Sequence, residues 1–395
     1  MDLSARARQV APSPTLAIDR EQKALVARGE DVVSFGIGEP DFETPPFIAE
    51  AAIEAIRRGE TRYTATEGTP VLRAAIVSYL ERTEGLQYGP AEVMASVGAK
   101  QALYNALLAL VDPGDAVLIP APYWVSYPEQ VRLAGGVPVT VPTDPARGYH
   151  LTVEDLEQAY RPGVRGLIVN SPNNPTGALV ADTDARAIAA FCERHDLFVI
   201  ADEIYHRLTY GPSPVTSLAS LPGMRERTVI VNGVSKSYAM TGWRIGFAAG
   251  PSEVVAAMGR IQGQTTSNPT SVSQAAAAAA LTGDDRSVDV MRRRFEARRH
   301  LMLAGLADMA GLHPVVPDGA FYIWVETGWL TGQHEGRPLA DGDVLARFLL
   351  ERARVAVVPG SGFGGPLAVR LSFAQSEERI LEGLSRMKKV LQTSV

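Results

Sequence analysis

Short apolar runs alternate with helical patterns through the middle of the chain. The runs lie at 116–120, 166–170, 197–203 and 228–236. Between Ala185 and His195 the apolar residues recur at helical spacing, which supplies one crossover between two runs. Short β-branched runs separated by helices are typical of a mostly parallel sheet covered on both faces. The pattern predicts an α/β fold whose ligands bind at the carboxyl ends of the strands.

The two ends of the chain predict a second, smaller unit. The first dozen residues are basic and polar and lead into Pro12 and Pro14, so we expect an arm rather than a packed element. Helices are predicted at 18–28, 47–58, 291–309, near 344–352 and from 377, and strands at 32–38, 319–326, 355–360 and 367–373. We therefore expect an arm with part of a small domain (1–45), a large domain (46–290) and a small α+β domain (291–395).

Composition narrows the class of protein. The chain has 395 residues, of which 46% are apolar, and a formal charge of −6. A chain of this length buries a large core without help from a metal or disulfide. Mild acidity argues against nucleic acid or an anionic membrane surface as the main partner. No stretch approaches 18 uninterrupted apolar residues, so we expect no membrane span.

Cys192 is the only cysteine, and its flanks resemble the apolar face of a helix. We interpret it as a buried core thiol in a reducing compartment. The N-terminal sequence MDLSARARQV has no apolar core typical of a secretory signal. Together these features predict a cytoplasmic protein.

Three familiar motifs are excluded. The glycines at 360–365 match G-x-G-x-x-G, but Pro366 and a strand follow instead of the helix that would hold a pyrophosphate, so we interpret them as a turn. The segment 233–237 narrowly misses the nucleophile elbow because its last residue is not glycine. The six histidines are scattered without metal-ligand spacing, so no metal site is predicted.

Four polar residues at predicted strand ends and loops form the strongest chemical pattern. Asp202 ends one apolar run, Lys236 ends the next, Arg244 follows eight residues later, and Asn174 lies in a rigid loop with two prolines. Each alone has an ordinary explanation: a helix cap, a solvated lysine, a surface ion pair and a turn. Together they predict an amine, an acid, an anion-binding group and an amide in one cleft.

This combination suits pyridoxal phosphate (PLP). Lys236 supplies an amine for a Schiff base with the aldehyde. A buried carboxylate such as Asp202 keeps the pyridine nitrogen protonated. Arg244, Ser235 and a helix N-terminus at 98–100 supply the cation and donors that the phosphate needs.

At this point the sequence resembles the fold-type I PLP-dependent aminotransferases of class I, most closely the bacterial aspartate aminotransferases. The matching strings, in order, are GEPDF, YTATEGTPVLR, PYWVSYPE, NSPNNPTG, DEIY, SKSYAMTGWRIG and VVPGSGFG. They extend over nearly the whole chain, from PSPT at 12–15 to RLSF at 370–373. The resemblance implies a large domain with a mostly parallel sheet plus a smaller α+β domain.

The resemblance also implies roles for the residues that match. Lys236 would bind the cofactor and shuttle the proton, and Asp202 would pair with the pyridinium nitrogen. The other implied cofactor contacts are Tyr205 and Asn174 at the phenolic oxygen, Trp124 on the ring, and Gly98, Ala99, Lys100, Ser235 and Arg244 at the phosphate end. Tyr63 would reach the phosphate of the neighbouring subunit in a homodimer. Without the resemblance, Trp124 and Tyr63 are interpreted as core residues.

Substrate contacts are implied in the same way. Arg370 would grip the substrate α-carboxylate as a fork, assisted by the Gly38 N–H, although alone it is interpreted as a solvated strand residue. Lys100 and Thr15 match positions that contact a distal carboxylate, which favours aspartate and glutamate. Ala11 replaces a basic residue of the prephenate-accepting relatives, and Ile37 is bulkier than its counterpart there, which argues against prephenate.

The implied reaction is ping-pong transamination from L-aspartate, or a similar amino acid, to 2-oxoglutarate. Two alternatives stay open. One is another PLP activity on the same fold, such as an aromatic aminotransferase or a C–S lyase. The other is a regulator that uses the fold as a sensor. Known fused regulators add a DNA-binding module ahead of the fold, whereas here the resemblance begins near residue 13 and the Lys, Asp and Arg set is kept.

Overall fold

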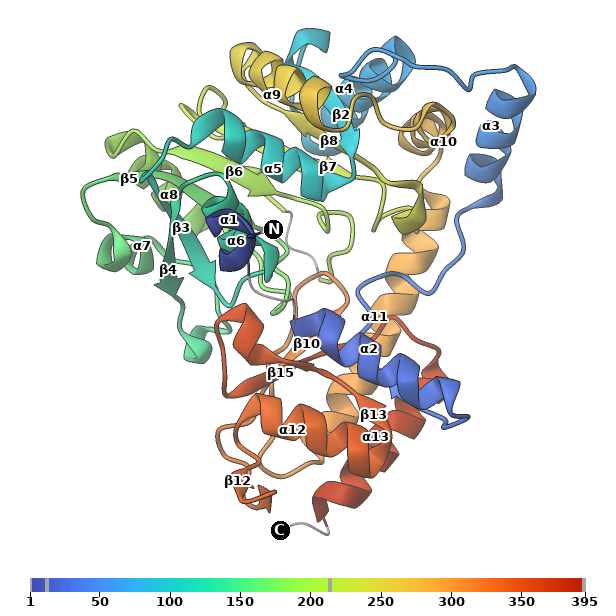
Figure 1. The fold of residues 1–395 in the computed structure, drawn as a ribbon, viewed down its shortest axis with the longest axis vertical. Coiled ribbons are helices and arrows are strands. Elements are labelled where there is room, and N and C mark those ends of the chain that lie inside the picture. Colours follow the sequence, from blue (N-terminus) through green and yellow to red (C-terminus); the bar gives the residue numbers. More distant parts are fainter. Residues whose placement is uncertain (1, 11–13, 212–214, 393–395) are drawn as a thin grey trace.

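The computed structural model describes the backbone of residues 2–10, 14–211 and 215–392, and their side chains except at 5, 9, 14–17 and 19. Figure 1 shows two lobes, an upper one with the larger sheet and a smaller lower one. The lower lobe contains both α2 (Pro14–Ala27) and the C-terminal helix α13 (Glu377–Gln392). The long helix α11 (Arg286–Ala307) extends between the lobes. Segments from opposite ends of the chain therefore build one lobe.

The upper lobe contains a seven-stranded sheet with the order β2-β8-β7-β6-β5-β3-β4. Its strands are β2 (Val93–Val97), β3 (Ala116–Ala121), β4 (Val137–Pro142), β5 (Val164–Asn170), β6 (Phe198–Asp202), β7 (Thr228–Gly233) and β8 (Ile245–Ala249). β8 is antiparallel to both neighbours, and every pair from β7 to β4 is parallel. The predicted mostly parallel sheet is confirmed.

Helices cover both faces of this sheet. In β7, Val229 and Val231 enter the core under α5 (Ala99–Leu110) and α9 (Ser252–Thr265), whereas Ile230 enters the core on the opposite face. The inner strands are mostly apolar because both of their faces are buried, whereas the edge strand β4 alternates between buried and exposed residues. The remaining helices are α3 (Pro46–Arg57), α4 (Pro70–Glu84), α6 (Ser126–Leu133), α7 (Val153–Ala159), α8 (Asp182–Arg194) and α10 (Ser271–Thr282). Cys192 on α8 is buried, as predicted.

The lower lobe combines small sheets with helices. One antiparallel sheet has the order β14-β15-β10-β9, and β1 pairs in parallel with β13. The strands are β1 (Val33–Ser34), β9 (His313–Pro314), β10 (Tyr322–Glu326), β11 (Gln333–His334), β12 (Arg337–Pro338), β13 (Val355–Ala356), β14 (Val358–Pro359) and β15 (Ala368–Ser372). The helix α12 (Gly342–Phe348) continues into a π-turn, Leu349–Ala353.

Parallel register brings polar residues to one edge of the large sheet. Asn170, the last residue of β5, pairs with Asp202, the last residue of β6. β7 ends at Gly233, and Ser235 and Lys236 follow it immediately. Because parallel strands share a direction, these carboxyl ends meet at the same edge, which is where the sequence predicted the ligand site.

Several details differ from the sequence predictions. The strand expected over 32–38 is shorter, since β1 ends at Ser34 and only Phe35 beyond it still bonds to the backbone of β13 and β15. From Gly36 the backbone lines the cleft between the lobes, and the Gly36 carbonyl accepts from the Arg370 side chain instead of a strand. The exposed N-terminal arm contains one short helix, α1 (Ala5–Gln9), capped by Ser4. The domain boundary near 290 falls inside α11 and stays a prediction.

The glycine-rich segment begins with a 3-10 turn and leads into β15, which agrees with its interpretation as a turn. The described residues also form 3-10 helices of one turn each, at Pro90–Glu92, Pro145–Arg147, Leu218–Ser220, Thr241–Trp243 and Gly360–Phe363.

Among the described helices, none combines the length and apolar character needed to cross a membrane.

A substitution of Phe295 on α11 would measure how much the core of the lower lobe contributes to stability. Phe295 is fully buried, with its ring centroid 5.3 Å from those of both Phe42 and Phe321. Phe295→Ala should lower the free energy of unfolding by about 3–5 kcal/mol, because it leaves a cavity that rigid neighbours cannot fill. Urea unfolding measures this, with Leu381→Ala on the exposed face of α13 as the control expected to change stability by about 0.5 kcal/mol or less. Equal losses for the two variants would contradict the prediction.

Candidate active site

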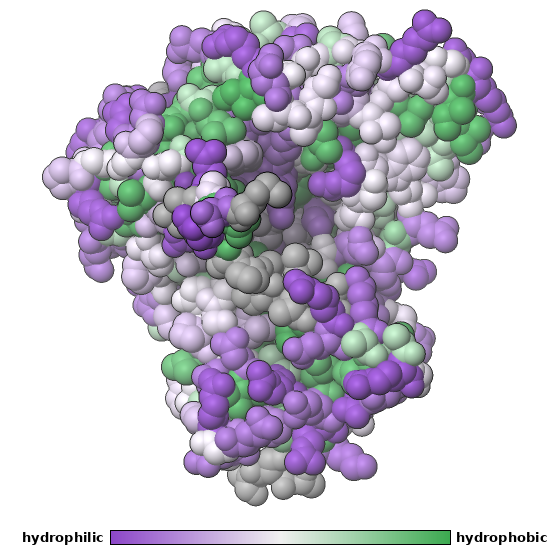
Figure 2. Space-filling view, in the orientation of Figure 1, coloured by the Kyte–Doolittle hydropathy of each residue, from purple (hydrophilic) through white to green (hydrophobic). Residues whose placement is uncertain are grey.

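A cleft of about 550 Å³ lies between the two lobes, and Figure 2 shows the surface hollowed there. The carboxyl ends of β5 and β6 and the residues that follow β7 form part of its wall, and β14 and β15 contribute from the lower lobe. It brings together most of the predicted site residues: Ile37, Gly38, Ala99, Lys100, Trp124, Asn174, Asp202, Tyr205, Ser235, Lys236, Arg244 and Arg370.

Three predicted residues are not among those that line the cleft. Gly98 lies directly under Arg244, at the edge of the cleft. Tyr63 is 91% exposed and lies in a separate groove beside α3 and α10, so its interpretation as an ordinary buried tyrosine is wrong. Thr15 belongs to α2, but its side chain is outside the described part of the chain, as is all of Ala11.

Asp202 is 3% exposed and accepts two hydrogen bonds. The Tyr127 hydroxyl donates to its Oδ2 at 2.7 Å, and the Ile204 N–H donates to its Oδ1 at 3.2 Å. Burial raises the pKa of Asp202 to about 6, while these two donors and the nearby Lys236 charge oppose the rise. The following residues form a turn, so Asp202 caps no helix. A carboxylate has about four lone-pair sites, so Asp202 keeps room for a further donor from the cleft.

Lys236 is half-buried, and its Nζ donates a hydrogen bond to the Gly38 carbonyl. Burial lowers the pKa of Lys236 to about 8. Glu39 and Asp202 raise this pKa, and the guanidinium groups of Arg370 and Arg244 lower it. Near neutral pH the amine therefore exchanges readily between its charged and neutral forms, which is what a proton-transferring group requires.

The far end of the cleft combines three features that favour negative charge: a cation, a helix N-terminus and a hydroxyl. Gly98 has φ +79° and precedes the first turn of α5, whose free N–H groups favour negative charge. A Cβ on Gly98 would overlap the Arg244 guanidinium, and one on Gly246 would overlap the Ala99 backbone. Two glycines thus allow a cation and a helix N-terminus to approach each other, with the Ser235 side chain also lining the cleft.

Arg370 lies at the opposite end and is 3% exposed, so its interpretation as a solvated strand residue is wrong. Its Nη1 donates to Asn174 Oδ1 at 3.0 Å, and its Nη2 donates to the Gly36 carbonyl at 3.1 Å. Its guanidinium carbon lies 4.2 Å from the ring centroid of Tyr322, and burial lowers the Arg370 pKa. Asn174 and the aromatic ring hold the guanidinium in place, which preorganises it for a carboxylate.

Aromatic rings form the remaining walls. Trp124 is half-buried and packs edge-to-face on Tyr127, with centroids 5.4 Å apart. Lys100 Nζ lies 4.7 Å from the Trp124 ring, and the Lys100 pKa is lowered by burial and by Arg244. The Tyr205 and Tyr322 hydroxyls are hydrogen-bonded to each other at 3.0 Å. These contacts fix flat surfaces around the space between Asp202 and Lys236.

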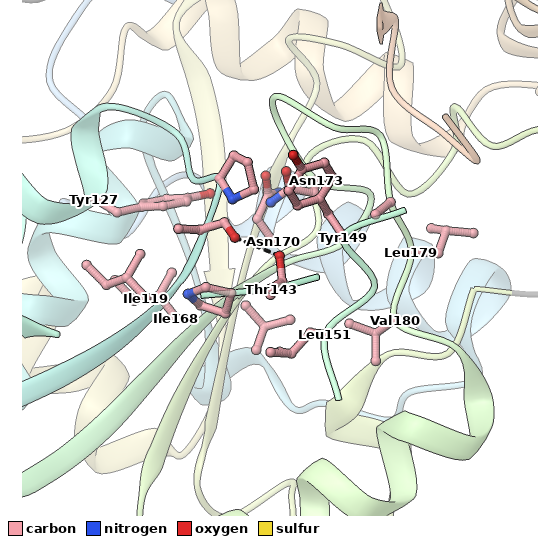
Figure 3. Close-up of a pocket in the computed structure, with 15 residues that line it drawn as sticks. Ile119, Tyr127, Thr143, Tyr149, Leu151, Ile168, Asn170, Asn173, Leu179 and Val180 are labelled. Carbon is pink, nitrogen blue, oxygen red and sulfur yellow. Dashed lines mark hydrogen bonds between the residues drawn. The ribbon is translucent and has the colours of Figure 1, made fainter. Parts of the chain in front are cut away.

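A second, much smaller cavity lies behind the wall formed by Tyr127 and Asn170, which line both spaces. Figure 3 shows it bounded by β3, β5 and the loop after Asn170. The Thr143 hydroxyl beside it donates to the Ala121 carbonyl at 2.6 Å. The cavity volume of about 30 Å³ is close to one water molecule's share of liquid volume, so it cannot hold a cofactor.

Within the described residues, no group of three His, Cys, Asp or Glu is arranged to hold a metal ion.

The sequence analysis missed Tyr127 and Tyr322. Tyr127 follows Trp124 by three residues in PYWVSYPE, a spacing that places both on one side of a helical turn. Tyr322 lies on β10 directly opposite Ser372, two residues from Arg370 on β15. The first was visible in the local pattern, whereas the second depends on a strand pairing that sequence spacing does not reveal.

Known proteins resemble this chain over nearly its whole length. Residues 30–387 match the family described as aminotransferase class I and II. The aspartate aminotransferase of Geobacillus stearothermophilus is 45% identical, with 99% of each chain covered. A probable aspartate/prephenate aminotransferase of Aquifex aeolicus is 44% identical over 99% of this chain and 98% of its own. The crystal structure of the aspartate aminotransferase from Rhizobium meliloti superposes with a TM-score of 0.95 at 41% identity, covering 99% of each chain.

The contact between Tyr127 and Asp202 predicts a pH effect in the cofactor-free protein. The folded-state pKa of Asp202, about 6, lies above its ordinary value of 3.8, so the protonated carboxyl stabilises the folded protein. This contribution to the free energy of unfolding is complete below about pH 4 and is lost as pH rises through 6. Tyr127→Phe removes a donor to the carboxylate and should extend this loss to higher pH. Asp202→Asn should remove the contribution of Asp202 and leave that of the buried Glu84 and Glu203 carboxyls, whose pKa values burial also raises. Urea unfolding between pH 4 and 8 measures both. Superimposable wild-type and Tyr127→Phe curves would contradict the proposed coupling.

Proposed function

Because this chain belongs to the aminotransferase class I and II family, we propose that it uses PLP to transfer the amino group of L-aspartate to 2-oxoglutarate. The products are oxaloacetate and L-glutamate. One observation carries the proposal: the Lys236 amine and the buried Asp202 carboxylate line the same cleft, with a buried Arg370 on its other side.

The cleft residues fit this cofactor at several points. Asp202 keeps room for the protonated ring nitrogen, and Trp124 offers a flat ring. The amide of Asn174 and the hydroxyl of Tyr205 are suitable donors for the phenolic oxygen. Gly98, Ala99 and Lys100 at the start of α5, with Ser235 and Arg244, are the residues that would hold the phosphate. When bound, PLP supplies an aldehyde for the amino group and a ring that accepts electron density.

The protein's own groups then account for binding and proton transfer. The Arg370 fork and the Gly38 N–H bind the substrate α-carboxylate, which orients the Cα–H bond. Neutral Lys236 Nζ is the group that would take the proton from Cα and carry it to the cofactor instead of back to Cα. Burial helps to keep a fraction of this amine neutral near pH 7. The amino acid and the oxo acid use the cleft in turn, which gives ping-pong kinetics.

We propose that residues of the cleft also select the side chain of the amino acid substrate. Lys100, and Thr15 by its position in the chain, favour a second carboxylate and hence aspartate or glutamate. Ile37 lines the cleft with a bulky apolar side chain, which together with Ala11 argues against prephenate. Because Ile37 and Trp124 also favour apolar side chains, an aromatic aminotransferase is the second candidate. A C–S lyase or a sensor on this fold would also bind PLP, and a substrate panel separates all of these.

We also propose a homodimer, in which Tyr63 reaches the phosphate of the neighbouring subunit. Large apolar side chains are exposed on and beside α3, and Figure 2 shows apolar surface where Figure 1 places that helix. They are Phe47, Ile53, Ile56 and Val71. A groove of about 890 Å³ next to Tyr63 is continuous with this surface. A cytoplasmic location stays a prediction from the sequence.

The decisive experiment adds L-aspartate, without any oxo acid, to protein loaded with PLP. We expect the cofactor absorbance to change and about one equivalent of oxaloacetate to appear per site, because the first half-reaction needs no acceptor. A cofactor band that does not respond to aspartate would support the aromatic or lyase candidates. The absence of any cofactor band would refute the proposed role of Lys236.

Arg370 provides a second test. Arg370→Ala should reduce transition-state binding by about 2–5 kcal/mol, because a buried charge pair loses one partner. Arg370→Lys should rescue little of the loss, since an ammonium cannot form the two parallel hydrogen bonds of the fork. The ratio kcat/KM for aspartate measures both, with exposed Arg347→Ala as the control. A decrease of less than tenfold would contradict the proposed role.

A further inference from the structure

The segment Gly36–Glu39 crosses the cleft between β1 and the loop that leads to α3, and all four of its residues line the cleft. Three side chains from distant parts of the chain hold it. Arg370 Nη2 donates to the Gly36 carbonyl at 3.1 Å, and Lys236 Nζ donates to the Gly38 carbonyl. The Thr241 hydroxyl donates to Glu39 Oε2 at 2.6 Å.

Two of these three contacts involve groups that have other tasks. Under the proposed function, Lys236 binds the cofactor and Arg370 binds the substrate carboxylate, so neither is a constant support for the segment. The Glu39–Thr241 hydrogen bond involves no such group. It is the contact that remains available to hold Gly38 through the reaction.

The neighbouring contacts make this support rigid. Glu39 precedes Pro40, which restricts the backbone of the preceding residue to extended conformations. Five residues further on, the Thr44 hydroxyl donates to the Ala239 carbonyl at 2.8 Å and accepts from the Trp243 indole N–H at 3.0 Å. The segment and the 239–243 loop are thus joined at two places, on either side of Pro40.

Glu39 also contributes charge. The charged groups around Lys236 are Glu39, Asp202, Arg244 and Arg370, and the Tyr205 ring lies 5.9 Å from its Nζ. Among these charges, Glu39 has the largest effect, and it raises the Lys236 pKa against burial and the two arginines. A carboxylate beside the amine therefore favours its protonated form.

From these contacts we propose that Glu39, held by Thr241, is a positioning residue: it fixes Gly38 at the mouth of the cleft and keeps a carboxylate beside the Lys236 amine. The first effect rests on the proposed function, because it concerns substrate binding at the Gly38 N–H. The second effect is a property of the protein without cofactor.

The charge effect is tested on cofactor-free protein by measuring the rate of Lys236 acylation against pH with an amine-reactive ester and peptide mass spectrometry. Glu39→Gln keeps a hydrogen-bonding group but loses the charge, so the apparent pKa of Lys236 should fall by about 0.5–1. Glu43→Gln removes an exposed charge from the same loop without lining the cleft and should leave the profile unchanged. A Glu39→Gln profile identical to that of Glu43→Gln would overturn this part.

The positioning effect is tested with Thr241→Val, which removes the hydroxyl at nearly constant volume. In PLP-loaded enzyme we expect KM for L-aspartate to rise at least fivefold with a smaller change in kcat, and Thr241→Ser to restore it. An unchanged KM would overturn the positioning role. If aspartate proves not to be a substrate, the acylation assay still decides the charge effect, so failure of the proposed function is distinguishable from failure of this inference.

Discussion

Burial of charge between the lobes is the constraint on which the site depends. A carboxylate and a guanidinium that are each 3% exposed lose their hydration and must be stabilised by fixed partners. Tyr127 and the Ile204 N–H stabilise Asp202, and Asn174 with the Tyr322 ring stabilises Arg370. The same burial shifts the pKa values of Asp202 and Lys236 towards neutrality. The groups that hold these charges in place therefore also adjust their chemistry.

Much of this could be predicted from the sequence, for identifiable reasons. The large sheet was predictable because most of its strands are short, apolar on both faces and separated by helices. Asp202 and Lys236 could be placed because strand ends in parallel sheets share an edge. The environment of Arg370 could not be predicted, because it depends on pairing between β10 and β15 and on contact with Gly36, 334 residues away along the chain. Alternation along a strand identifies a face but not what covers it.

The strand predicted over 32–38 illustrates the same limit. Its apolar residues favour a strand, and the first of them do pair with β13. Phe35 still bonds to the backbone of Ala356 and Ser372, but the carbonyls of Gly36 and Gly38 accept hydrogen bonds from cleft side chains instead. Local propensity does not distinguish these two kinds of partner, since both satisfy an extended backbone.

Pairing of β1 with β13 also constrains the order in which the molecule can assemble on the ribosome. Val33 and Ser34 emerge from the ribosome early, but their partners Val355 and Ala356 are synthesised more than 300 residues later. The seven-stranded sheet, which ends at Ala249, can form while the N-terminal segment still waits for its partner. The cleft therefore cannot be complete until Arg370 has been made, by which point every strand of the large sheet is already available.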